Sequence, residues 1–131
     1  MEKCNAFYGA IAVFTDCDVN GKTLVSEEGY THGHTAFVYG KLQNGDYCIL
    51  GGNQGDQLKV SNYDCRGKAF YSYKKTDETK IYKRFRNFYK PRGYAIKKAD
   101  GLTDNYAKLS DANIKVINKA IKENKNGEKS Q

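Results

Sequence analysis

The sequence predicts an α+β fold in which a small, mostly antiparallel β-sheet is followed by a C-terminal α-helix. Three observations support this prediction: several short β-rich runs, an Asn44-Gly45 hairpin signal between two of them, and isoleucines at helical spacing near the C-terminus. The chain has 131 residues and no internal linker, so we expect one domain spanning residues 1–131. Hydrophobic residues make up 39% of the chain, which suits a folded protein rather than a disordered one.

The first half of the chain carries the clearest strand signals. Gly9–Phe14 is an almost continuous apolar run, which is typical of a buried strand. Residues 15–33 are polar and rich in Gly, Asp, Asn and Glu, so we expect a long loop with a short ribbon within it. Further strands are expected at Thr35–Lys41, Tyr47–Gly51 and Gln57–Asn62.

The second half of the chain is less regular before its final helix. Tyr71–Tyr73 is compatible with a strand, and residues 79–88 carry aromatic residues at mixed spacing. Tyr94–Ile96 is expected to be the last strand of the sheet. Ser110 is expected to cap a helix that runs to about residue 125, with Gly127 beyond its end. The isoleucines that share one face of this helix are Ile114, Ile117 and Ile121.

The Asn44-Gly45 turn also predicts a strand register. A two-residue type I′ loop at this position pairs Val38 with Gly51. Because side chains alternate between faces, His34 then shares a face with Asn53, its diagonal cross-strand neighbour, roughly 7–8 Å away by backbone. An asparagine that orients an imidazole is part of the Cys-His-Asn hydrolase site.

Three segments of the chain resemble strands of the CHAP and NlpC-type cysteine peptidases, which are papain-like amidases that cut peptidoglycan. These segments are Tyr8–Phe14, Gly33–Gly40 and Ile49–Gly55. The resemblance implies a papain-like half-barrel. It covers residues 8–63 as a core and 91–96 more weakly. Residues 64–90 are therefore expected to be an insertion, and residues 91–126 to hold the last strand and the C-terminal helix.

The resemblance also implies catalytic roles. His34 matches the general base of the family and Asn53 the residue that orients it, with Gln54 as a second polar neighbour. The family's nucleophilic cysteine begins a helix well before the first core strand, and only seven residues precede Tyr8. We therefore expect that helix to be missing. Cys4 is the candidate replacement nucleophile, and the alternative is an ordinary terminal cysteine.

The other cysteines and the histidines predict no metal site and no cofactor. The cysteines show neither CxxC spacing nor a metal-ligand pattern with the histidines, and no signal-peptide h-region precedes them. We therefore expect free thiols, with Cys48 in the core on the face away from His34. His32 is expected to be a solvated loop residue rather than a metal ligand beside His34.

The net charge of +7 predicts an anionic partner. Positive charge is densest between residues 83 and 92, where cationic and aromatic side chains alternate. This interleaving suits stacking and phosphate contacts with single-stranded nucleic acid, and it equally suits a half-buried strand or helix with basic outer positions. The residues expected to bind an anionic partner are Lys83, Arg84, Arg86, Lys90 and Arg92.

Three functions follow from the sequence. The first is a peptidoglycan amidase or endopeptidase-like cysteine hydrolase domain, truncated or inactive, whose partners are a cell-wall polymer and a protein that supplies the missing helix. The second is a non-catalytic binding or structural module of a phage particle or secretion assembly, and the third and weakest is nucleic-acid binding. We expect no membrane span, synthesis in the cytoplasm, and delivery to the cell wall by a phage or secretion system.

Overall fold

The computed structural model describes residues 1–42, 44–52, 58–101 and 111–129, and in the final helix it describes the side chains of residues 114–123. The described residues form seven strands, a short 3₁₀ helix and one α-helix. These elements are β1 (Glu2–Cys4), β2 (Ile11–Cys17), β3 (Gly33–Lys41), β4 (Tyr47–Gly51), β5 (Lys59–Tyr63), β6 (Phe70–Lys74), β7 (Lys80–Lys90), η1 (Lys98–Asp100) and α2 (Asp111–Lys129).

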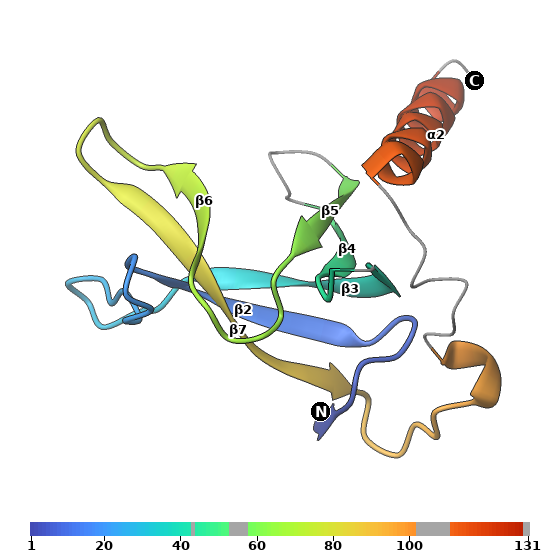
Figure 1. Ribbon diagram of the computed structural model, residues 1–131, viewed down its shortest axis with the longest axis horizontal. Coiled ribbons are helices and arrows are strands. Elements are labelled where there is room, and N and C mark those ends of the chain that lie inside the picture. Colours follow the sequence, from blue (N-terminus) through green and yellow to red (C-terminus); the bar gives the residue numbers. More distant parts are fainter. Residues whose placement is uncertain (43, 53–57, 102–110, 130–131) are drawn as a thin grey trace.

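All seven strands belong to one antiparallel sheet (Figure 1). Its order is β1-β7-β2-β3-β4-β5, and β6 also pairs with β7. β6 pairs with residues 80–83 of β7 and β1 with residues 88–90, so both strands lie along the same edge of β7. β7 thus joins β1, β2 and β6 into one sheet.

This architecture corrects the expected papain-like α+β half-barrel. The described residues form an open antiparallel sheet, and one α-helix follows it at the C-terminal end of the chain (Figure 1). Residues 64–90, which were expected to be an insertion, contribute β6 and β7. They are therefore part of the framework of the sheet rather than an addition to it.

A β-bulge explains why residues 79–88 showed no clear period. Phe14 pairs with Phe85 and Val13 pairs with Asn87, so Arg86 is an additional residue on β7. Because of this additional residue, Phe85 and Phe88 both pack into the same core, with their ring centroids 4.5 Å apart. Aromatic residues three positions apart thus share one face of a strand.

An aromatic cluster fills one face of the sheet, which we call the inner face. Phe14 is 1% exposed. Its ring centroid lies 5.0 Å from that of Tyr63, 5.9 Å from that of Phe70 and 5.8 Å from that of Phe85. These rings come from β2, β5, β6 and β7, so segments far apart in the sequence meet over β2. Burying a side chain of this size stabilises the fold by about 1.5–3 kcal/mol.

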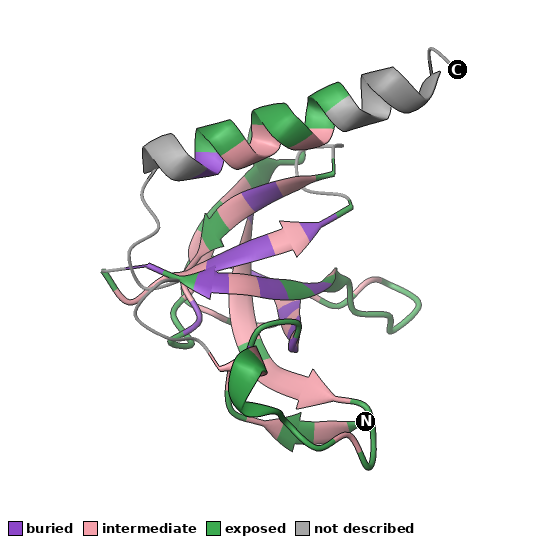
Figure 2. Cartoon of the chain, turned by 90° about the vertical axis from the view of Figure 1, so that its right-hand side faces the viewer, coloured by how far each residue is buried: buried purple, intermediate pink, exposed green. Residues whose placement is uncertain are grey.

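The opposite face of the sheet, the outer face, is covered by α2 over β4 and β5 (Figure 2). Ile114 packs with Leu42, Cys48 and Val60, and Ile117 and Ile121 pack against the same cluster. The predicted isoleucine stripe and the predicted core position of Cys48 are therefore confirmed.

Asn118 fixes α2 to the end strand of the sheet. Its side-chain nitrogen donates a hydrogen bond to the carbonyl oxygen of Val60 at 2.9 Å, and its side-chain oxygen accepts one from the Val60 N–H at 2.6 Å. The amide thus makes the pair of contacts that the backbone of a neighbouring strand would make.

The β3–β4 hairpin has a different register from the predicted one. The Leu42 N–H donates to the Asp46 carbonyl at 2.8 Å, so the loop is longer than the expected two-residue turn. Val38 pairs with Ile49 instead of Gly51. Lys41 pairs with Tyr47, a shift of one residue, and a β-bulge between Val38 and Gly40 makes the shift two residues at Val38. A shift of two keeps the side chains beyond the bulge on their predicted faces, because the period of a strand is two. Val38 and Ile49 therefore still share the inner core.

Two expectations for the second half of the chain are wrong. Tyr94–Ile96 is not a strand; the Tyr94 ring stacks on that of Phe7 at 5.9 Å, and its hydroxyl donates to Asp100 at 2.5 Å. The final helix also continues through Gly127 to Lys129. The expected cap, Ser110, lies outside the described residues.

The loop between β2 and β3 contains the expected short ribbon. Isolated bridges join Cys17 to Thr23 and Val25 to Thr31. This prediction is confirmed.

Candidate functional site

The predicted histidine site is only partly described. His34 lies on β3, half-buried, with its ring 6.3 Å from that of Phe14 and 5.9 Å from that of Tyr63. It therefore faces the aromatic cluster of the inner face. Asn53 and Gln54 lie outside the described residues, so their pairing with His34 stays a prediction.

The structure does not bring Cys4 to His34. Cys4 pairs with Phe88 at the edge of the sheet, and the path from β1 to β3 crosses β7 and β2. Three strand spacings correspond to about 14 Å along the sheet. Burial also raises the pKa of the Cys4 thiol, whereas a nucleophilic cysteine needs a lowered pKa.

The other thiols are buried and poorly ionised. Cys17 and Cys48 are 0% exposed and Cys65 is 9% exposed. Burial raises the pKa of Cys48 and that of Cys65 to about 12. Such thiols have little thiolate character at neutral pH, which makes them weak nucleophiles.

Two of the five cations predicted to bind an anionic partner instead stabilise the fold. The Lys83 Nζ lies 3.0 Å from an Asp16 carboxylate oxygen and donates to the Ser72 hydroxyl, also at 3.0 Å. The side chains of Lys83 and Asp16 are both 11% exposed. Lys90 lies 3.3 Å from a Glu2 carboxylate oxygen and donates to the Tyr94 carbonyl. These contacts give Lys83 and Lys90 a structural role, and their expected binding of an anionic partner stays a prediction.

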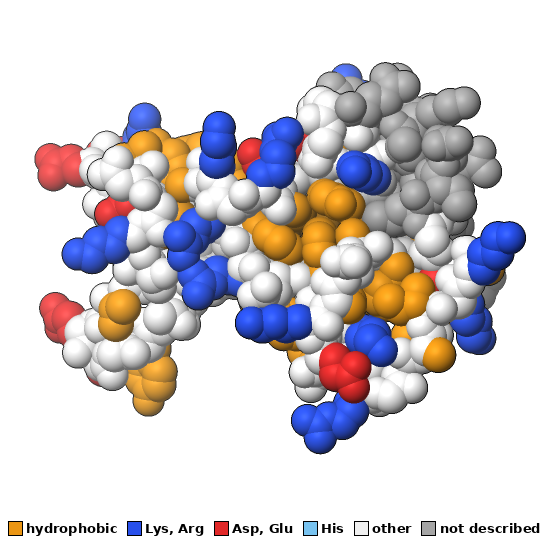
Figure 3. Space-filling view, turned by 60° about the horizontal axis from the view of Figure 1, so that its bottom comes forward, with side chains coloured by type: hydrophobic (Ala, Val, Ile, Leu, Met, Phe, Trp, Pro, Cys, Tyr) orange, Lys and Arg blue, Asp and Glu red, His pale blue; other side chains and the backbone are white. Residues whose placement is uncertain are grey.

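The other three predicted cations are the arginines. Within the described part of the chain, neither Arg84, Arg86 nor Arg92 has an acidic residue within ion-pair distance. Arg86 and Arg92 are exposed, and Arg84 is half-exposed. Figure 3 shows that Lys and Arg side chains surround a hydrophobic patch on one face of the molecule. A positive surface of this kind attracts anions.

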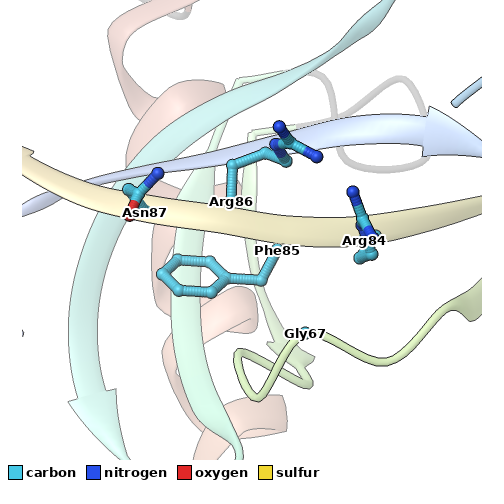
Figure 4. A pocket seen from close by; sticks show the side chains of 5 residues that line it. All are labelled: Gly67, Arg84, Phe85, Arg86 and Asn87. Carbon is cyan, nitrogen blue, oxygen red and sulfur yellow. The ribbon is translucent and has the colours of Figure 1, made fainter.

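Arg84 and Arg86 meet at an open pocket of about 260 Å³, which we call the notch (Figure 4). Its other lining residues are Gly67, Phe85 and Asn87. In Figure 4 the Arg86 side chain lies on the opposite side of β7 from the Phe85 ring. The residues that line the notch include neither Asp nor Glu.

The notch exists because β7 has an uncovered stretch on one edge. β6 pairs with β7 as far as Lys83, and the pairing of β1 with β7 begins at Phe88. Among the described residues, no strand therefore flanks residues 84–87 on that edge. The β-bulge at Arg86 falls within this stretch. Two guanidinium groups and a carboxamide at one opening can donate hydrogen bonds to phosphate or carboxylate oxygens.

Sequence reasoning missed Asn87 and Gly67. Asn87 directly follows the two predicted arginines, but only the bulge brings it to the same opening. Gly67 has a positive φ of 95°, which glycine adopts at little cost in a tight turn. Nothing in the local sequence shows that this turn lies beside β7.

Comparisons with family models, curated proteins and solved structures found no match for this chain. No described helix is long and apolar enough to cross a membrane. In the same part of the chain, no group of three or more His, Cys, Asp or Glu is placed to hold a metal ion. His32 is exposed in the loop before β3, as predicted.

Proposed function

We propose that this chain is a non-catalytic binding module that holds an anionic polymer at the notch. The observation that supports this function is the meeting of Arg84 and Arg86 at an opening without a carboxylate, where neither has an ion-pair partner among the described residues. The net charge of +7 adds a long-range attraction for the same class of ligand.

The test is binding of linear polyphosphate, measured by calorimetry at several salt concentrations. The double variant Arg84→Gln/Arg86→Gln should weaken binding by about tenfold or more, because each arginine lost removes a phosphate contact. The slope of log K against log salt should also become shallower by about 0.7 for each lost contact.

A matched variant separates the notch from general charge. Lys75→Gln/Lys80→Gln removes the same charge from two exposed lysines around the β6–β7 turn. It should bind polyphosphate almost as the intact chain does. Equal losses in the two double variants, or no binding by the intact chain, would contradict a specific site at the notch.

The cysteine hydrolase is the second candidate function. Its support is the sequence resemblance of Gly33–Gly40 and Ile49–Gly55 to the histidine strand and the following segment of peptidoglycan amidases. Its test is muropeptide release from purified peptidoglycan, with His34→Ala and Cys4→Ser measured beside the intact chain. A binding module should release none. Release that both substitutions abolish would establish the hydrolase instead, with Cys4 as its nucleophile.

A further inference from the structure

We propose that the anionic polymer is single-stranded nucleic acid, whose bases stack on the outer face of β7, β2 and β3 while its phosphates reach the notch. This inference rests on the proposed function and adds the ligand class. Its additional support comes from Phe37 and Tyr89, which do not line the notch.

The strand register places the outer-face side chains in rows that cross three strands. Ile11 pairs with both Phe37 and Tyr89, which gives one row across β3, β2 and β7. Val13 pairs with Thr35 and Asn87, and Thr15 pairs with Gly33 and Arg84, which gives two further rows. Two aromatic rings therefore share a face with Arg84 and Asn87 of the notch.

This part of the outer face is open to solvent. Phe37 is 54% exposed, whereas its neighbours Ala36 and Val38 on the inner face are 3% and 1% exposed. Ile11 and Val13 are partly exposed although β2 has a strand on each side. α2 packs over β4 and β5, and the β2–β3 loop comes close to these rows at Gly21, where an added Cβ would lie 3.7 Å from the Arg84 Cδ.

The spacing of the side chains suits a chain of nucleotides. Phe37 and Tyr89 are two strand spacings apart, about 10 Å, and Asn87 precedes Tyr89 by about 7 Å along β7. Bases stack on aromatic rings whatever their sequence, and arginines contact the phosphates between them. The bases of a duplex are already paired and stacked, so the geometry favours a single strand.

The occupant is inferred from the combination of rings and charge. A phosphate polymer without bases would be attracted by Arg84 and Arg86 but would gain nothing from an exposed Phe37. An apolar protein partner would use the rings but would leave both guanidinium groups without a ligand. A single-stranded nucleic acid uses both.

The experiment compares four probes by fluorescence anisotropy or by competition at about 0.15 M salt. These are oligothymidylate and oligouridylate of about 20 nucleotides, a DNA duplex of the same length, and linear polyphosphate. The single strands should bind more tightly than the duplex and the polyphosphate. The two single-stranded probes distinguish a DNA partner from an RNA partner.

Substitutions of the aromatic residues then test stacking. Phe37→Ala and Tyr89→Ala should each weaken the binding of the single strands by about tenfold and leave polyphosphate binding unchanged. Phe37→Tyr should retain binding, because the ring remains. Tyr30→Ala is the matched control, since Tyr30 is 66% exposed but lies in the β2–β3 loop rather than in the three rows.

Each outcome separates this inference from the function on which it rests. If polyphosphate binds as tightly as the single strands and Phe37→Ala changes neither affinity, the stacking inference is overturned and the anion-binding function stands. If no probe binds, both fail. Phe37 lies outside the buried core, so its substitution tests binding even if Tyr89→Ala does not fold.

Discussion

The two faces of β7 use the same kinds of residue in opposite ways. On the inner face, Lys83 is held by Asp16 and Ser72 and is 11% exposed. The next residue, Arg84, points to the other face and lines the open notch. In β7, one cation therefore stabilises the fold through an ion pair, and its neighbour lies on a surface that a ligand can reach.

The aromatic residues of β7 divide in the same way. Phe85 and Phe88 pack in the inner core, whereas Tyr89 lies on the outer face in a row with Ile11. A basic and aromatic stretch of sequence thus does not define a binding surface by itself. The strand period and the position of the bulge decide which of its residues are available.

The largest expected difference between the faces is in stability. Phe14→Ala should lower the free energy of unfolding by about 3–5 kcal/mol, because it leaves a cavity among the rings of the inner face. Phe37→Ala on the outer face should change it by less than about 1 kcal/mol. Urea denaturation measures both, and similar losses would show that the outer face also contributes to the core.

Neighbouring cations on β7 give the next largest contrast. Lys83→Ala should cost about 3 kcal/mol of stability, because it leaves the Asp16 carboxylate buried without its partner. Arg84→Ala should cost under about 0.5 kcal/mol. Adding Asp16→Asn to Lys83→Ala should recover part of the loss in the same denaturation experiment. A double variant less stable than Lys83→Ala alone would contradict this account.

Asn118 tests the part of the outer face that α2 covers. Asn118→Ala should lower the free energy of unfolding by about 1–2 kcal/mol, because it removes both hydrogen bonds to the buried Val60 backbone. Lys119→Ala, on the exposed side of the same helix, is the control and should change stability little. Equal thermal midpoints for the two variants would show that Asn118 does not anchor the helix.

The smallest expected effect is a pH dependence near the β3–β4 loop. The Arg66 guanidinium beside Asp64 lowers the pKa of that carboxyl below its ordinary value. The ionised form therefore stabilises the fold above the ordinary carboxyl range, and this contribution is lost as pH falls through the lowered pKa. Asp64→Asn should therefore flatten the acid end of a stability–pH curve measured by urea denaturation.

The sequence predicted the parts of the fold that depend on short-range patterns. The strand Tyr47–Gly51 has the predicted bounds, and the isoleucine stripe of α2 packs as expected. The role of β7 in joining β1, β2 and β6 was not predictable from the sequence. Its partner β1 lies more than 80 residues earlier in the chain, and the bulge at Arg86 interrupts its alternating pattern.

The candidate site shows the same limit. The basic cluster was visible in the sequence, and Arg84 and Arg86 remain candidates for binding. Lys83 could not be separated from them, because its partner Asp16 is 67 residues away. Exposed cations and paired cations look alike until the sheet register is known.

The contact between Asn118 and Val60 also bears on whether two copies of this protein can pair through their sheet edges. β5 is the end strand of the sheet, and an open strand edge is a template for pairing with another chain. The Asn118 amide occupies the N–H and carbonyl that Val60 would offer to such a strand. A helix side chain thus shields this edge from intermolecular sheet growth, and loss of α2 would expose it.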